Sequence, residues 1–194
     1  AGDDLVCLLD RGYPAAIAYN SVDNRIYAGG TTCDRIVVVD QATGVRIARI
    51  LTPEGKGVHR LCHNPVNNKL YAATSTGSAD LLVIDATTNG VLATIPVSGY
   101  VDGLCVNPLT DQVYCTNSSK DSVTVIDGTT NGVVAQVKVG DGPYALCVNT
   151  TDNKVYCSST NDSSVTVIDG ATNGVLATVP TGRYPLALCW NSQQ

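Results

Sequence analysis

A fourfold internal repeat constrains this 194-residue chain more than any other feature. Aligned on a tyrosine, the copies lie 44, 43 and 42 residues apart (71−27, 114−71, 156−114), at Tyr27, Tyr71, Tyr114 and Tyr156. Aligned on an acid, they place equivalent carboxylates at Asp40, Asp85, Asp127 and Asp169. A period in the low forties, built from short β-runs, is typical of β-propeller blades. We therefore predict an all-β fold with almost no helix.

Each copy contains four short strands separated by turn sequences. In the third copy the predicted strands are residues 103–107, 112–117, 122–127 and 133–139. The third of these alternates polar and β-branched residues, which is typical of a half-buried strand. The turn before the last strand ends in Asn131-Gly132, a dipeptide that accepts positive φ. The pattern predicts blades of four antiparallel strands.

The repeat organises the whole chain as one expected domain, residues 1–194. Four complete units cover about 14–50, 58–97, 101–139 and 143–180, with 51–57 inserted as a longer connector. Residues 5–9 match an outer strand, and residues 186–190 match an inner strand. The two middle strands of that last blade have no counterpart, so we expect either a longer parent protein or completion by another copy.

Composition excludes several classes of partner. The net charge of −5, with 15% charged residues, gives no basic surface for nucleic acid. No apolar run reaches the roughly 18 residues that a membrane-spanning helix needs. The chain begins Ala1-Gly2-Asp3 and contains no methionine, which indicates an N-terminus made by cleavage of an export signal or by truncation.

The eight cysteines contain no C-x-x-C pair. Cys105 and Cys115 occupy the same two places in their unit as Cys147 and Cys157, ten residues apart, where the first unit has Ala18 and Ala28. This spacing favours hairpin disulfides over free thiols, and with them an extracellular or cell-surface location. The remaining cysteines are expected to be unpaired or to form links between subunits: Cys7, Cys33, Cys62 and Cys189.

Nothing in the sequence predicts catalysis, a cofactor or a metal. His59 and His63 flank Cys62, but neighbouring residues of one strand point to opposite faces, so these side chains would not converge on a metal. No G-x-S-x-G elbow or glycine-rich phosphate loop is present. The recurring aspartates are expected to accept hydrogen bonds from turn amides, and the recurring tyrosines to lie in the blade core. Three sequons provide candidate N-glycosylation sites, with the first two expected in turns and the third more covered: Asn117, Asn161 and Asn149.

The motifs resemble the YVTN family of β-propeller repeats along essentially the whole chain. Tyr114-Cys115-Thr116-Asn117 matches the naming motif with cysteine in place of valine, and residues 125–132 and 167–174 match the strand-turn motif. The resemblance implies mostly extracellular or surface-layer proteins, with some redox and lyase enzymes carrying related blades. Family propellers commonly close with about seven blades, whereas this chain holds four complete units.

Three functions remain open at this point. The first is a non-enzymatic extracellular structural protein, a surface-layer or filament subunit that joins other copies of itself through its terminal strands. The second is a module that binds a glycan or protein, for which the connector 51–57 could serve. The third is a fragment of a larger lyase or redox propeller.

Overall fold

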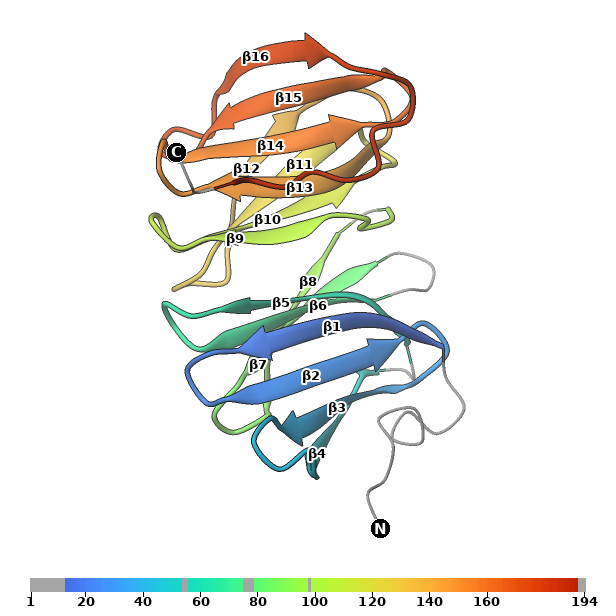
Figure 1. Cartoon of the computed structure of the whole chain (residues 1–194), viewed down its shortest axis with the longest axis vertical. Coiled ribbons are helices and arrows are strands. Elements are labelled where there is room, and N and C mark those ends of the chain that lie inside the picture. Colours follow the sequence, from blue (N-terminus) through green and yellow to red (C-terminus); the bar gives the residue numbers. More distant parts are fainter. Residues whose placement is uncertain (1–12, 54–55, 75–78, 98, 192–194) are drawn as a thin grey trace. The chain divides into compact units, whose positions relative to one another are not determined.

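Four separate four-stranded antiparallel sheets make up the computed structural model, which describes residues 13–53, 56–74, 79–97 and 99–191 (Figure 1). Each sheet pairs its strands in chain order, and there is essentially no helix in these ranges. This confirms the predicted all-β fold of four-stranded blades. No helix in the described residues has the length and apolar character needed to cross a membrane.

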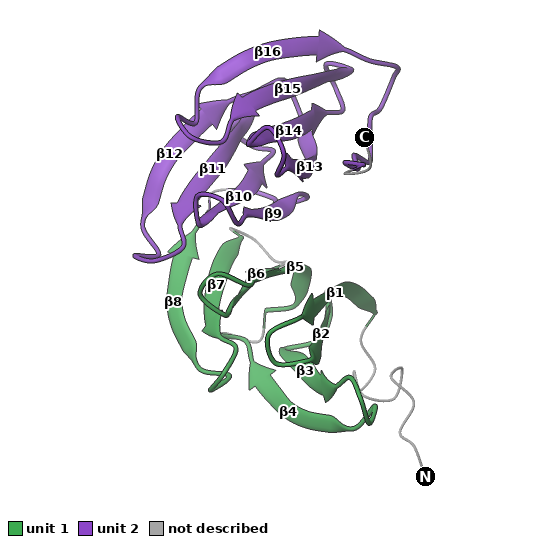
Figure 2. Ribbon diagram, turned by 60° about the vertical axis from the view of Figure 1, so that its left-hand side comes forward, with its two compact units in different colours: residues 1–96 green, residues 97–194 purple. Residues whose placement is uncertain are grey.

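The first two sheets lie in residues 1–96, one of two units drawn in different colours in Figure 2. The first sheet consists of β1 (Pro14–Asn20), β2 (Arg25–Gly30), β3 (Arg35–Asp40) and β4 (Arg46–Leu51). The second consists of β5 (Val58–Asn64), β6 (Lys69–Thr74), β7 (Asp80–Asp85) and β8 (Val91–Pro96).

The other two sheets lie in residues 97–194. The third sheet consists of β9 (Leu104–Asn107), β10 (Gln112–Asn117), β11 (Ser122–Asp127) and β12 (Val133–Lys138). The fourth consists of β13 (Pro143–Asn149), β14 (Lys154–Ser159), β15 (Ser164–Asp169) and β16 (Val175–Pro180). The bounds of the third sheet agree within one residue with those predicted from the repeat.

The turn after each third strand is built on the recurring aspartate. In the third sheet the Asp127 carboxylate accepts hydrogen bonds from the backbone N–H and the hydroxyl of Thr130, at 2.6 and 2.8 Å. Asn131 closes the turn at φ 60°, and the N–H of Asp127 bonds to the carbonyl of Gly132. Asp40, Asp85 and Asp169 accept equivalent bonds, which confirms the structural role predicted for these acids.

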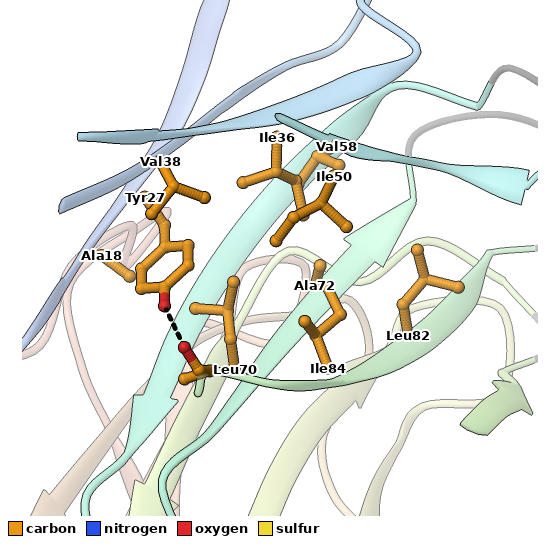
Figure 3. Close-up of a cluster of buried hydrophobic side chains, with 11 residues drawn as sticks. Ala18, Tyr27, Ile36, Val38, Ile50, Val58, Leu70, Ala72, Leu82 and Ile84 are labelled. Carbon is orange, nitrogen blue, oxygen red and sulfur yellow. Dashed lines mark hydrogen bonds between the residues drawn. The ribbon is translucent and has the colours of Figure 1, made fainter. Parts of the chain in front are cut away.

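Within residues 1–96 the two blades pack face to face. Side chains from β2, β3 and β4 meet side chains from β5, β6 and β7 in one buried cluster (Figure 3). The hydroxyl of Tyr27 crosses this interface and donates to the carbonyl of Ala86, 3.2 Å away. The backbone ladders are formed within each sheet, whereas burial of these apolar side chains requires a second blade.

The two predicted terminal strands have different outcomes. Residues 5–9 lie outside the described residues. Residues 186–190 form no strand, and this part of the prediction is wrong. Inner strands such as β9 and β13 pair only with the second strand of their own blade, and the described residues provide no second strand for 186–190. A ladder cannot form without that neighbour.

Candidate functional site

Within each of the two units, the face of the first blade that carries the recurring tyrosine is covered by the second blade. In β9–β12 this tyrosine face comprises Cys105, Tyr114, Val123, Val125, Ala135 and Val137. It packs against the opposite face of β13–β16, which contributes Leu146, Val148, Val155, Cys157 and Ile168. Tyr114, Val123 and Val125 are fully buried as a result.

The tyrosine face of the last blade has a different environment. We call it the open face, and its register-matched residues are Cys147, Tyr156, Val165, Val167, Ala177 and Val179. Val179 is 48% exposed, whereas its repeat equivalent Val137 is 6% exposed. Tyr156, Val165 and Val167 are only half-buried. Apolar side chains that the repeat normally buries are thus accessible here.

The C-terminal segment crosses one edge of the open face beside β13 (Figure 1). Leu188, Cys189 and Trp190 line a cavity of about 300 Å³ together with Cys147 and Tyr156. Leu188 and Trp190 are the repeat equivalents of Leu146 and Val148. The segment therefore lies where the inner strand of a following blade would lie.

Polar contacts between blades accompany the apolar ones. The Tyr114 hydroxyl lies 2.8 Å from Oδ1 of Asn173 in the next blade and 2.8 Å from Oε1 of Gln112 on its own strand. Asn107 donates to Asn153 Oδ1 of the next blade at 2.7 Å. Burial, with a smaller contribution from Cys105, raises the pKa of Tyr114 to about 12. Tyr114 therefore serves as a blade-core residue, as the sequence predicted.

The strand register corrects the predicted disulfides. Cys105 lies opposite Tyr114, and Cys115 lies opposite Leu104. In the next blade Cys147 lies opposite Tyr156, and Cys157 lies opposite Leu146. A one-residue offset places the two cysteines of each hairpin on opposite faces of the sheet. No disulfide joins Cys105 to Cys115 or Cys147 to Cys157.

The remaining cysteines have varied environments. Cys33 is buried, Cys62 lies opposite Tyr71 on β6, and Cys189 is exposed. Cys7 lies outside the described residues. Burial raises the pKa of both Cys115 and Cys157 to about 12, so these two thiols are poor nucleophiles at neutral pH.

The three sequons differ sharply in accessibility. Asn117 ends β10 and is 1% exposed, so its predicted place in an accessible turn is wrong. Asn149 is fully buried, and its side chain accepts hydrogen bonds from the backbone of Thr151 and Asp152. Asn161 is exposed. Of the three, only Asn161 presents its side chain to solvent.

The histidines and the connector are engaged in local contacts. His63 Nε2 lies 3.0 Å from Asn68 Oδ1. Over the ranges that the structure describes, no group of three or more His, Cys, Asp or Glu side chains could hold a metal ion. In the connector, Thr52 is buried and Lys56 forms a 2.7 Å ion pair with Asp80. The described part of this connector is therefore held against its own unit.

A second, polar cavity lies at the end of the last blade. It has a volume of about 260 Å³ and is lined by Thr160, Asn161, Ser163, Arg183 and Tyr184. Tyr184 is exposed and adopts φ 56°. The cavity combines an amide, hydroxyls, a guanidinium and an aromatic ring.

Sequence reasoning missed one regularity that the structure makes evident. The pattern Leu-Cys-x-Asn recurs on successive inner-strand positions, with cysteine at 62, 105, 147 and 189. Alignment of these four cysteines with one another, rather than with a partner in the same hairpin, would have placed them on equivalent faces. It would also have placed Cys189 beside the blade that carries Cys147.

The fold defines the chain as a propeller-like repeat protein of four-stranded blades. Scans against models of protein families and against curated proteins find no match. Among solved structures, apo AztD from Citrobacter koseri superposes with a TM-score of 0.73 at 14% identity, over 91% of this chain and 49% of that chain. Kuenenia stuttgartiensis hydrazine synthase gives 0.76 at 17%, over 86% and 48%, and U3-55K gives 0.75 at 18%, over 90% and 54%. The chain spans about half the length of these structures, and at such identities the likeness shows the fold alone.

Proposed function

We propose that this chain is a non-enzymatic structural protein that associates with other copies of itself through the open face. The observation that carries the proposal is the contrast between Val179 and Val137, two residues at the same repeat position, of which only one is covered. Burying a valine side chain completely stabilises by about 1.5–3 kcal/mol. A face with several such side chains therefore favours association.

The biological setting is part of the same proposal. We place the protein outside the cell, as a surface-layer or filament subunit of the YVTN type. The supports are the regular repeat and the motif Tyr114-Cys115-Thr116-Asn117. A head-to-tail contact that does not close would produce a filament, whereas a contact between two open faces would produce a dimer.

The test is the mass of the protein in solution as a function of concentration, measured by light scattering and sedimentation. We expect association of the wild-type chain and its loss in Val179→Asp, because a carboxylate on the open face would be buried without a partner. Val133→Asp is the matched control. Val133 is 47% exposed and begins the outer strand of the preceding blade, so the two substitutions start from equal exposure.

A wild-type chain that remains monomeric at high concentration would refute self-association. The intact mass of the native protein then shows whether further blades of the same polypeptide cover the open face. A mass much larger than that of this chain would show that blades of the same polypeptide cover the open face. The half-length match to the solved structures makes this the main competing outcome.

The polar cavity favours a second candidate, a module that binds a glycan. Arg183, Tyr184 and Asn161 supply a charged donor, an aromatic surface and an amide, which are the groups that hold polar ligands in place. Screening the protein on a glycan array, with Tyr184→Ala as the comparison, tests this candidate. Binding that is unchanged in the variant would exclude the cavity as the site.

A further inference from the structure

The cavity on the open face brings together two cysteines that are far apart in the sequence. Cys147 lies on β13 and Cys189 lies on the C-terminal segment, and both line the same space of about 300 Å³. The other lining residues, Tyr156, Leu188 and Trp190, are aromatic or aliphatic. Two cysteines thus line one small cavity whose other lining residues are aromatic or aliphatic.

The shared cavity lining brings the C-terminal segment next to Cys147. Leu188, Cys189 and Trp190 line this cavity together with Cys147, which places these residues beside β13. Burial raises the pKa of Cys147, the Trp190 N–H opposes this shift, and the Cys189 sulfur is close enough to raise the pKa further. Cys189 itself is exposed, so a soluble oxidant can reach it.

We propose that Cys147 and Cys189 form a reversible disulfide that fastens the C-terminal segment to the edge of the open face. This assignment is independent of the proposed self-association, because both cysteines belong to one chain. It also differs from the pairing expected from the sequence, in which Cys147 would bond to Cys157 of its own hairpin.

A small disulfide such as oxidised glutathione supplies the oxidising equivalents by exchange. Cys189 loses its proton to solvent, and its thiolate attacks one glutathione sulfur, releasing one glutathione thiolate, which takes up a proton. Cys147 then loses its proton, attacks the Cys189 sulfur of this mixed disulfide and releases the second glutathione. The protein loses two hydrogens, and one oxidised glutathione becomes two reduced ones.

The neighbouring cysteines do not compete for this reaction. Cys115 and Cys157 are buried, with their pKa raised to about 12, so they offer almost no thiolate at neutral pH. Cys105 packs against the buried cluster between β9–β12 and β13–β16, where the neighbouring cysteine is the buried Cys157. The pairing should therefore be selective.

The experiment is peptide mapping without reduction, after the whole chain has been incubated with oxidised glutathione at a concentration that keeps it monomeric. Trypsin cleaves after Lys138, Lys154 and Arg183, which leaves Cys147 alone in peptide 139–154 and Cys189 alone in peptide 184–194. We expect these two peptides to be linked, the intact mass to fall by two hydrogens, and dithiothreitol to restore both thiols. Fluorescence of Trp190, the only tryptophan, should decrease in parallel, because it lines the cavity beside the new bond.

Two variants provide the controls. Cys105→Ser should leave the linked peptide at the wild-type yield, whereas Cys147→Ser should stop the reaction at the mixed disulfide of Cys189 with glutathione. A wild-type protein in which Cys189 remains glutathionylated while Cys147 stays a thiol would overturn the proposal. A link from Cys189 to Cys189 of a second chain, or from Cys147 to Cys157, would overturn it as well.

Discussion

Truncation of two repeat-equivalent valines gives a direct measure of what covers the open face. Val137 and Val179 occupy the same position on successive outer strands and differ in exposure, 6% against 48%. Val137 packs in the cluster between β9–β12 and β13–β16. The change is Val→Ala at each position, which removes the same two methyl groups.

The expected costs follow from burial. A buried methyl or methylene contributes about 0.8 kcal/mol, and an unfilled cavity adds to the loss, so Val137→Ala should cost about 2 kcal/mol. Val179 is about half as buried, and its surroundings can relax into solvent, so Val179→Ala should cost about 1 kcal/mol or less. The difference of about 1 kcal/mol is a factor of about 5 in the unfolding equilibrium.

Urea unfolding followed by Trp190 fluorescence, at several protein concentrations, measures both costs. At low concentration we expect Val137→Ala to be the more damaging change. If a second copy covers the open face, the cost of Val179→Ala should rise with concentration towards that of Val137→Ala, since binding stabilises the folded state by mass action. Equal costs at the lowest concentration would refute the assignment of Val179 to an uncovered face.

Four further outcomes are expected. Tyr114→Phe should cost about 1 kcal/mol in chemical denaturation, because it removes the hydroxyl bonded to Gln112 and Asn173, and Tyr156→Phe should cost less. Asn131→Val should destabilise by about 1–2 kcal/mol in thermal melts, because Asn131 sits at φ 60°, while Asn131→Gly should be tolerated. Hydrogen bonds from Thr172 and Ala171 lower the pKa of Asp169 in the folded state. The ionised carboxylate therefore stabilises the fold above its unfolded-state pKa, and this stabilisation is lost as the pH falls through the lower folded-state pKa. In acid titration, the free energy of unfolding of Asp169→Asn should fall less steeply than that of wild type. Oxidation of Cys147 and Cys189 should strengthen self-association in sedimentation, because it holds the C-terminal segment in place before a second copy binds. Unchanged association after complete oxidation would show that this disulfide does not pre-organise the surface through which the copies bind.

The sequence predicts the blades well because the signals for them are local. Strands β10 and β11 have the predicted bounds, since alternation of polar and β-branched residues and the Asn-Gly turns act over only a few residues. The recurring aspartates were predictable for the same reason: the carboxylate of Asp127 bonds to the residues that immediately follow it.

The candidate site was less predictable because it depends on register and on neighbours distant in sequence. A shift of one residue in the β9–β10 pairing decides whether Cys105 and Cys115 share a face, and spacing alone does not fix that shift. Asn117 is 1% exposed although it lies next to a turn, so proximity to a turn did not predict its exposure. Residues 186–190 carry an inner-strand pattern, but a strand also needs a partner.

The structure also changes the physical reason for expecting a partner. The sequence suggested that unpaired strand edges would recruit a second chain by extending a ladder. In every described sheet, however, the first and fourth strands are edge strands, and each blade has its full set of four strands. What a blade lacks by itself is cover for its tyrosine face. Tyr114 is fully buried where the next blade is present, and Tyr156 is only half-buried on the last blade. The self-association that we propose would therefore be driven by apolar burial across faces, which any blade of complementary shape could satisfy.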